Sequence, residues 1–397
     1  MVPPQVVTVP ADLVERWRRD TPATARRIHL NNAGAALPPQ SVVDVMTRHL
    51  LREAEIGGYE AAEEAEGRLD EVYGHLARLV GASPREIAIV ENATVAFSLA
   101  LSAFDFQPGD ILVTTRSDYT SNWIMYLALR DRRGVEVLAA EDLPEGGVDP
   151  ASVRELAAHP RCRLVAVSWV PTNSGLVQPV PEIGEVCREL SVPYLVDACQ
   201  AVGQIPIDVA RVGCDFLAVT ARKFLRGPRG LGFLYVSDRK LAEGIYPLGI
   251  DMRGARRVGT DGFELEEGAR RFENWEFPYA LVLGMGEAAR YALEVGIEQT
   301  GERARELAAC VREKLSAIPG AEVWDRGPRL CAIATASVEG RDATGLMHRL
   351  RAAGVNVSVS SSEDGSQTPV LRISPHYYNT PEEIDAAVAA IEEMARD

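Results

Sequence analysis

Short apolar runs alternate with segments of helical spacing through most of the chain. Each run has about the length of a single strand and is bounded by turn residues. The runs occupy residues 111–115, 164–170, 194–198, 216–220 and 232–236. Uninterrupted apolar runs of this kind are typical of strands buried on both faces, and the segments between them have the spacing of amphipathic helices. The pattern predicts an α/β fold with a mostly parallel sheet between helices.

The C-terminal part of the chain has a different pattern. A long helix is predicted from about 278 to 317, and after Pro319 the order becomes strand, helix, strand, strand, helix. The last helix opens with TPEE at 380–383, a capping box with proline at the first helical position. We therefore expect three parts, namely an N-terminal segment (1–30) packed on the small domain, a large domain (31–285) and a small α+β C-terminal domain (286–397).

The composition argues against several classes of function. The formal net charge of −15 leaves no basic excess to neutralise phosphates, which argues against nucleic-acid binding. The six cysteines form no CxxC pair and no metal-ligand cluster, so we expect reduced thiols and no metal site. No apolar run reaches the roughly 18 residues that span a bilayer, and the N-terminus lacks a basic start followed by an apolar run. We expect a cytoplasmic enzyme or binding protein without a membrane partner.

Polar residues follow several of the predicted strands, where parallel α/β sheets bind their ligands. The residues ENAT at 91–94 precede a buried helix, whose free N–H groups suit a phosphate, although a plain threonine N-cap is favoured when this segment is taken alone. Tyr119 follows the strand at 111–115, where an aromatic ring either covers a flat ligand or lies at an interface. Thr172 lies after the strand at 164–170, in a segment that composition explains as a turn.

Two further strand ends carry charged residues. Asp197 ends an apolar strand, where a carboxylate is costly unless it is paired. The next strand is followed by TARKFLRGPRG at 220–230, for which a solvated basic loop is the alternative explanation. This segment supplies Thr220, Arg222 and Lys223. Together with Gln200, which lies three residues after Asp197, these groups would enclose one cofactor. A carboxylate beside a pyridinium nitrogen and a lysine in a Schiff base are the protein groups that pyridoxal phosphate (PLP) requires.

Three segments are similar to motifs of one enzyme family. The motif SxHKxxGPxG reads TARKFLRGPRG here, and VDACQ at 196–200 is similar to VD(G/A)xQ. LRIS at 371–374, followed by YNT at 378–380, is similar to the family's arginine segment. Over nearly its whole length the chain resembles the class V aminotransferases, which are PLP enzymes of fold type I. The resemblance implies a large domain with a mostly parallel, seven-stranded sheet, a small α+β C-terminal domain, and PLP as the cofactor.

The resemblance also implies a role for each matching residue. Lys223 forms the Schiff base with PLP and then removes the Cα proton of the substrate, while Asp197 pairs with the ring nitrogen. Gln200 reaches the phenolic oxygen of the cofactor, and Tyr119 stacks on its ring. The expected phosphate contacts are Ala93, Thr94, Asn122, Thr220 and Arg222, with Arg222 at the family's usual histidine position.

On the substrate side, the resemblance implies that Arg372 binds the α-carboxylate through a bidentate fork. Thr172 stands where many relatives have an asparagine near the cofactor. Tyr59, in the GGY segment at 57–59, either contacts the substrate or belongs to a plain turn, and His376 is either structural or close to the carboxylate. Asn274 and Trp275 lie where relatives have a cross-subunit phosphate contact, so we expect a homodimer with shared active sites.

Departures from the family pattern bear on the reaction. Cysteine desulfurases carry a nucleophilic cysteine on a loop before the substrate arginine, whereas residues 357–367 read VSVSSSEDGSQ here. The ergothioneine-pathway lyase, which cleaves the sulfoxide of a cysteine conjugate, is similar at EAEIGGY (53–59), RKFLRGPRG (222–230) and TPVLRISPH (368–376). NNAG at 31–34 is instead typical of the wider class V group, which includes isopenicillin N epimerase-like proteins.

We therefore expect a PLP-dependent C–S β-lyase. Its substrate would be a small cysteine S-conjugate or its sulfoxide, and its products would be pyruvate, ammonia and a sulfur compound in sulfur or natural-product metabolism. An aminotransferase, an epimerase or a decarboxylation-coupled oxidative deaminase is the first alternative, because these reactions share the same Cα deprotonation. A protein of this fold that binds a partner without turnover is the second alternative.

Overall fold

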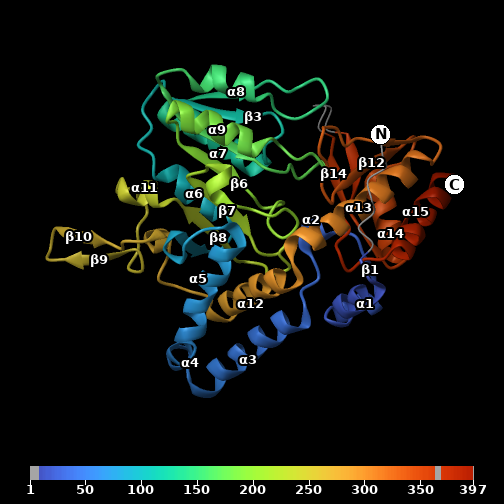
Figure 1. The fold of residues 1–397 in the computed structure, drawn as a ribbon, viewed down its shortest axis with the longest axis horizontal. Coiled ribbons are helices and arrows are strands. Elements are labelled where there is room, and N and C mark those ends of the chain that lie inside the picture. The colour runs from blue at the N-terminus through green and yellow to red at the C-terminus, as the bar shows by residue number, and fades with distance from the viewer. Residues whose placement is uncertain (1–8, 363–367, 397) are drawn as a thin grey trace.

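A seven-stranded sheet forms the centre of the molecule (Figure 1). The computed structural model describes residues 9–362 and 368–396. In their order across the sheet the strands are β2 (Ile87–Val90), β8 (Gly232–Val236), β7 (Phe216–Thr220), β6 (Tyr194–Asp197), β5 (Cys162–Ser168), β3 (Ile111–Thr115) and β4 (Glu136–Ala140). Only β8 runs antiparallel to its neighbours within this sheet. The predicted α/β fold with a mostly parallel sheet is thus confirmed.

Alternate residues along each strand pack on opposite faces of this sheet. Val113 on β3 and Val196 on β6 belong to one cluster, which includes residues of α5 (Glu66–Val80), α9 (Val180–Leu190) and α12 (Tyr279–Val295). Their neighbours Leu112 and Leu195 belong to a second cluster with α6 (Ala93–Ser102) and α7 (Thr120–Arg133). Because successive side chains of a strand point to opposite faces, an uninterrupted apolar run supplies both cores.

A smaller antiparallel sheet lies beside this body. Its order is β11 (Ala321–Val323), β12 (Ala334–Val338), β15 (Pro369–Ile373) and β14 (Ser358–Ser361). It packs with α13 (Ile297–Ser316), α14 (Ala343–Ala352) and α15 (Pro381–Arg396). Helix α15 opens with the predicted capping box, in which Glu383 N donates to Thr380 Oγ1 at 3.3 Å and Thr380 N donates to the Glu383 carboxylate at 3.2 Å.

From residue 9 on, the N-terminal segment lies beside the small domain (Figure 1). Strand β1 (Ile28–His29) pairs in parallel with β13 (Val355–Asn356). Trp17 of α1 (Ala11–Arg19) is buried, and its ring lies 5.0 Å from that of Tyr377. The remaining helices that position the site or its surroundings are α2 (Asn32–Ala35), α3 (Gln40–Ile56), α4 (Gly58–Glu64), α8 (Pro150–Ala157), α10 (Val209–Val212) and α11 (Asp238–Ala242).

The prediction of one long helix from 278 to 317 is wrong in one respect. It is divided into α12 and α13 at Gly296, whose φ is +81°. Glycine adopts this left-handed conformation without the steric cost that other residues bear, so the chain changes direction there. Apolar spacing continues on both sides of the break, which is why the pattern alone does not reveal it.

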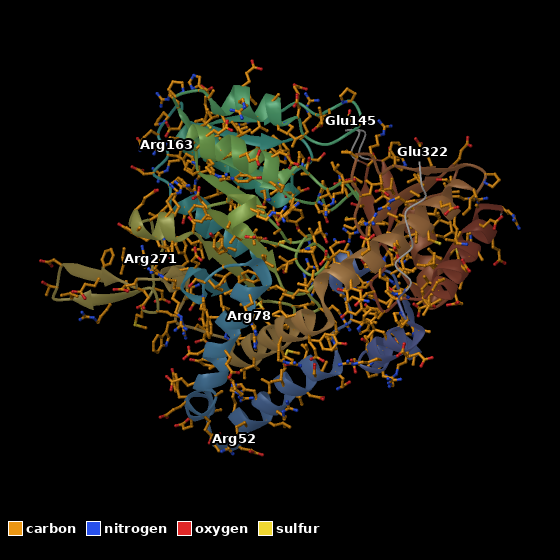
Figure 2. All side chains as sticks on the ribbon, in the orientation of Figure 1. Arg52, Arg78, Glu145, Arg163, Arg271 and Glu322 are labelled. Atoms are coloured by element: carbon orange, nitrogen blue, oxygen red, sulfur yellow. The ribbon has the colours of Figure 1, made fainter. Side chains whose placement is uncertain are left out.

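A hairpin of β9 (Ala255–Val258) and β10 (Gly262–Leu265) extends away from the body (Figure 1). Its base is held by Arg271, labelled in Figure 2, which is buried. The Arg271 guanidinium donates to the carbonyls of Glu266 at 3.0 Å, Glu267 at 2.8 Å and Ile245 at 3.1 Å. Across residues 9–362 and 368–396, no helix is both long and apolar enough to cross a membrane.

Candidate active site

Lys223 lies just beyond the carboxyl end of β7, in the loop that was predicted to hold a Schiff-base lysine. It is buried, and its Nζ lies 5.8 Å from the centre of the Tyr119 ring. Burial is the largest cause that lowers the pKa of the Lys223 ammonium group, and Arg222 and Arg372 lower it further. A lowered pKa increases the fraction of neutral amine, which is the nucleophilic form.

The chain contains only three lysines, and the other two are in ion pairs. Lys240 Nζ lies 2.6 Å from the Glu243 carboxylate, and Lys314 Nζ lies 2.9 Å from that of Asp385. Among the described residues, Lys223 is therefore the only lysine that is buried at the strand ends and forms no ion pair with a carboxylate.

Asp197 ends β6 on the same edge of the sheet and is buried. Its Oδ1 accepts from the backbone N–H of Cys199 at 3.0 Å, and its Oδ2 accepts from Asn122 Nδ2 at 3.1 Å. This geometry does not favour the expected phosphate contact of Asn122, because its amide nitrogen donates to Asp197 and Asp118. Asn122 lies in the first turn of α7, where its side chain contacts the carboxylates of Asp118 and Asp197.

The N-terminus of α6 and the end of β7 lie next to each other. Asn92 caps α6 by accepting from Val95 N at 3.0 Å, which leaves the N–H groups of Ala93 and Thr94 without an intrahelical partner. Thr220 pairs in register with Gly232. A Cβ on Gly232 would lie 3.3 Å from Ala93 N and 2.2 Å from the Val219 carbonyl oxygen. Only glycine permits this close approach, so the strand end and the helix N-terminus adjoin and form one polar surface.

Arg222 extends along the same surface. Its guanidinium donates to the Gly34 carbonyl, and burial lowers its pKa. The predicted phosphate contacts Ala93, Thr94, Thr220 and Arg222 therefore come from neighbouring segments of the structure. Their role as phosphate ligands remains a prediction.

Arg372, Thr172 and Gln200 form a connected group. Arg372 Nη1 donates to the Thr172 carbonyl at 2.7 Å and to Thr172 Oγ1 at 2.9 Å, and Arg372 Nε donates to Ser358 Oγ at 3.1 Å. Gln200 Nε2 lies 3.4 Å from the same Thr172 hydroxyl. Arg372 Nη2 has no hydrogen bond to a described residue, and burial lowers the pKa of this guanidinium to about 10, so it stays a cation at neutral pH.

Three other predicted residues, His376, Tyr59 and Trp275, have no hydrogen bond to Arg372, Thr172 or Gln200 in the part of the chain that the structure describes. His376 is fully buried; its Nε2 lies 3.0 Å from the Phe224 carbonyl oxygen and its Nδ1 accepts from Tyr377 N at 2.9 Å. Both ring nitrogens are occupied, so the structural alternative fits His376 and the substrate contact does not. Tyr59 and Trp275 are 74% and 48% exposed and line a surface cavity of about 610 Å³ with Leu50.

Glu273, which is buried, anchors the segment that carries Asn274 and Trp275. Asn274 Nδ2 donates to the Glu91 carboxylate at 2.9 Å, so Asn274 lies beside the α6 N-terminus of its own chain. The preceding Glu273 accepts from Ile89 N and from Tyr73 OH, both at 2.8 Å. Burial is the main cause that raises the pKa of Glu273 to about 7, against opposing effects of these bonds and of Arg253.

A Glu273→Gln variant is expected to change how stability depends on pH. Because the folded-state pKa of Glu273 lies above its ordinary value of 4.5, its contribution is fully present below that value and is lost as pH rises through about 7. Unfolding by urea at about pH 5 and about pH 8 should show the variant gaining on the wild type by about 2 kcal/mol at the higher pH. Exposed Glu276→Gln is the control; equal pH slopes for wild type and Glu273→Gln would contradict the expectation.

Arg226, the third basic residue of the 220–230 segment, has a role that the sequence pattern does not predict. It has a φ of +64° and is buried. Its guanidinium donates to the Leu37 carbonyl at 2.8 Å and to Thr21 Oγ1 at 2.6 Å, and lies 4.7 Å from the centre of the Tyr378 ring. Arg226 thus links the lysine loop to the N-terminal segment, and a one-dimensional charge pattern cannot distinguish it from its exposed neighbour Arg229.

Comparison with known proteins agrees with this geometry. A sequence model described as Aminotransferase class-V matches residues 28–387. The chain belongs to the class V aminotransferase family. Among curated relatives of this class V chain is a probable cysteine desulfurase of Methanothermobacter thermautotrophicus, 29% identical over 96% of this chain and 98% of the relative. A probable hercynylcysteine sulfoxide lyase of Mycobacterium tuberculosis is 29% identical over 96% of this chain and 93% of the lyase.

Two more comparisons place this class V protein within the family. Isopenicillin N epimerase of Streptomyces clavuligerus is 31% identical over 80% of this chain and 82% of the epimerase. The apo structure of a cysteine desulfurase from Thermococcus onnurineus NA1 has a TM-score of 0.89 at 23% identity, covering 96% of this chain and 98% of that chain. The structural match supports the fold, and the family match extends over nearly the whole chain.

This class V protein is a PLP-dependent enzyme, and three features of its site fit that cofactor. The Lys223 amine lies against the Tyr119 ring and not in an ion pair. The first N–H groups of α6 point out from the helix beside Thr220. Gln200 Oε1 is buried without a hydrogen-bond partner, so the side-chain amide of Gln200 has capacity for one more polar group.

Proposed function

We propose that this protein is a C–S β-lyase that acts on a cysteine S-conjugate or its sulfoxide. The Cα–H and Cβ–S bonds break, the sulfur group leaves with its bonding electrons, and hydrolysis of the remaining aminoacrylate gives pyruvate and ammonia. Bound PLP supplies the electron sink that makes the Cα proton acidic. The elimination needs one base and no second nucleophile, and this requirement matches the residues that line the site.

One observation carries this proposal: no thiol is available to accept sulfur. The segment before Arg372 contains no cysteine at 357–367; residues 363–367 lie outside the described residues, but their sequence is EDGSQ. Cys199 lies near Lys223 and Asp197, and burial raises its thiol pKa well above its ordinary value. A buried neutral thiol is a poor nucleophile, so transfer of sulfur to the enzyme is disfavoured.

The proposed roles follow from the contacts of each side chain. The Lys223 amine first binds the cofactor and then accepts the Cα proton, for which its lowered pKa is suited. Arg372 receives the substrate carboxylate through Nη2 and not through the bidentate fork expected from the sequence, because Thr172 and Ser358 already accept from its other two nitrogens. Asp197 keeps the ring nitrogen protonated, and Ala93, Thr94, Thr220 and Arg222 hold the phosphate.

The relatives support a sulfur-containing substrate. They include a sulfoxide lyase and several probable cysteine desulfurases. A structure of similar fold, with a TM-score of 0.85, is the complex of the cystine C–S lyase C-DES with cysteine persulfide. These proteins share cleavage of a bond to sulfur, so the elimination reaction is the candidate to test first.

Incubating the PLP-loaded enzyme with a panel of cysteine S-conjugates and sulfoxides tests the proposal. Mass spectrometry should detect pyruvate and a freed thiol or sulfenate, together with ammonia. An intact carbon–sulfur bond with loss of the α-amine, or inversion at the α-carbon, would instead indicate transamination or epimerisation. Epimerisation is the second candidate because of the similarity to isopenicillin N epimerase. Tight binding of the panel without any product would favour a non-catalytic binding protein.

We also propose a homodimer that covers the cavity lined by Leu50, Tyr59 and Trp275. Leu50 and Tyr59 are 55% and 74% exposed, and apolar side chains gathered around a groove are typical of an interface. Sedimentation should show a dimer, and Leu50→Glu should shift it to monomer at micromolar concentration because a charge would be buried without a partner. Ile124→Glu, on α7 with an exposure of 60%, is the control. A monomeric wild-type protein would contradict this proposal.

A further inference from the structure

A second carboxylate, Asp118, lies behind Asp197 at the end of β3. Its Oδ2 accepts from Thr114 Oγ1 at 2.8 Å and from Tyr126 OH at 2.7 Å. Its Oδ1 accepts from three donors, which are Ser168 Oγ at 2.5 Å, Tyr119 N at 2.6 Å and Asn122 Nδ2 at 3.1 Å. All five donors are neutral, and no ion pair with Asp118 occurs among the described residues. This is more donor bonding than an incidental loop residue needs.

Asn122 connects the two carboxylates. Its Nδ2 lies 3.1 Å from Asp118 Oδ1 and 3.1 Å from Asp197 Oδ2. A side-chain amide nitrogen carries two hydrogens, so each carboxylate accepts one of them. If the amide turned over, its oxygen would face two carboxylate oxygens, and both bonds would be replaced by repulsion. Asp118 therefore fixes the direction in which Asn122 donates.

The sheet keeps this arrangement rigid. Ser168, at the end of β5, pairs in register with Asp197 on β6 and bonds Asp118 after β3. Asn122 and Tyr126 lie one turn apart on α7 and are both buried. Burial raises the pKa of the Asp118 carboxyl, and hydrogen bonds from Ser168, Tyr126, Asn122 and Thr114 oppose that increase. These donors are therefore what permits a carboxylate at this position.

We propose that Asp118 is a positioning residue for the cofactor: it orients the Asn122 amide, and this amide holds the Asp197 carboxylate that would receive the ring nitrogen of PLP. Asp118 acts through Asn122. Fixed outer residues of this kind commonly determine how well an inner ligand is presented. The inference rests on the proposed role of Asp197 at the ring nitrogen, and it does not depend on which reaction follows.

The test measures PLP affinity and the ring-nitrogen NMR shift of isotope-labelled PLP in purified variants, so it does not depend on turnover. Asp118→Ala should weaken PLP binding about tenfold and move the ring-nitrogen shift toward the unprotonated value. Asp118→Asn should stay within about threefold of the wild type, because its amide oxygen can still accept from Asn122. Tyr126→Phe is the matched control, because it removes a donor to the same carboxylate without touching Asn122, and it should resemble the wild type.

A double variant shows whether the effect passes through Asn122. Asp118→Ala should cause no further loss in an Asn122→Ala background, since the residue through which it acts is gone. Additive losses, an equal loss in Tyr126→Phe, or no loss in Asp118→Ala would each overturn the inference. If Asp118→Ala does not fold, the isosteric Asn122→Asp should show the same loss, and wild-type PLP binding in that variant would also overturn it. Asp197→Ala is the reference; if it leaves the ring-nitrogen shift unchanged, the proposed role of Asp197 fails instead.

Discussion

A Lys223→Ala variant is expected to lose the Schiff-base absorbance of the bound cofactor and to lower kcat by about 10³-fold or more. The amine of Lys223 is the proposed partner of the cofactor and the proposed acceptor of the Cα proton, so one substitution removes both functions. No other lysine can substitute, because Lys240 and Lys314 are paired with Glu243 and Asp385. Absorbance spectra of the PLP-loaded variant and single-turnover assays measure the two losses separately.

Lys240→Ala is the matched control, because it also removes a buried lysine. That variant should keep the wild-type absorbance band and kcat, whatever its effect on stability. Schiff-base absorbance that persists in Lys223→Ala would show that a different amine binds the cofactor. The assignment of the 220–230 segment would then be wrong, and with it the proposed reaction.

An Arg372→Lys variant is expected to lower kcat/KM by about 10²-fold for substrates that carry an α-carboxylate. The Arg372 guanidinium is held by Thr172 through Nη1 and by Ser358 through Nε, which leaves Nη2 for the proposed contact with the substrate carboxylate. A lysine ammonium is a single point of charge, so it cannot bond Thr172 and Ser358 and also bind a carboxylate. The loss should appear mainly in KM, because the carboxylate is bound both before and during the reaction.

A substrate analogue makes this second prediction specific. An S-conjugate of cysteamine lacks the carboxylate, so wild type and Arg372→Lys should bind it with similar affinity. Arg351→Lys, on the exposed side of α14, should leave both compounds unaffected. If Arg372→Lys weakens the cysteine and cysteamine conjugates equally, Arg372 supports the structure of the site and does not bind the carboxylate.

Several site residues could be predicted from sequence because their positions relative to strands are local features. Asp197 and Lys223 each lie at or just after an apolar run, and the carboxyl ends of parallel strands meet at one edge of a sheet. The start of α6 was likewise visible as ENAT at 91–94, although its N-cap is Asn92 and the threonine N-cap was wrong. The α15 capping box was visible as TPEE at 380–383. Each of these depends on fewer than ten consecutive residues.

Other roles depend on which side chains meet across the fold. His376 lies four residues after Arg372, but its ring nitrogens are taken by the Phe224 carbonyl and the Tyr377 N–H. Asn122 was expected at the phosphate, and α7 instead directs its amide to Asp197. Sequence spacing specifies neither the direction of a side chain nor the partners that it finds 75 or 152 residues away.

The sequence by itself determined the α/β class, five of the seven strands of the large sheet, and the lysine, aspartate and arginine on which the proposed chemistry depends. It did not reveal β2 or β4. Apolar periodicity and strand-end position are properties of short segments, so they can be recognised without knowledge of the rest of the fold. Tertiary structure decided the break at Gly296, the buried partners of Arg226, and the bridge from Asp118 through Asn122 to Asp197. The bridge exists only once β3, β5, β6 and α7 lie side by side, because a hydrogen bond is specified by three-dimensional distance and direction and not by residue type.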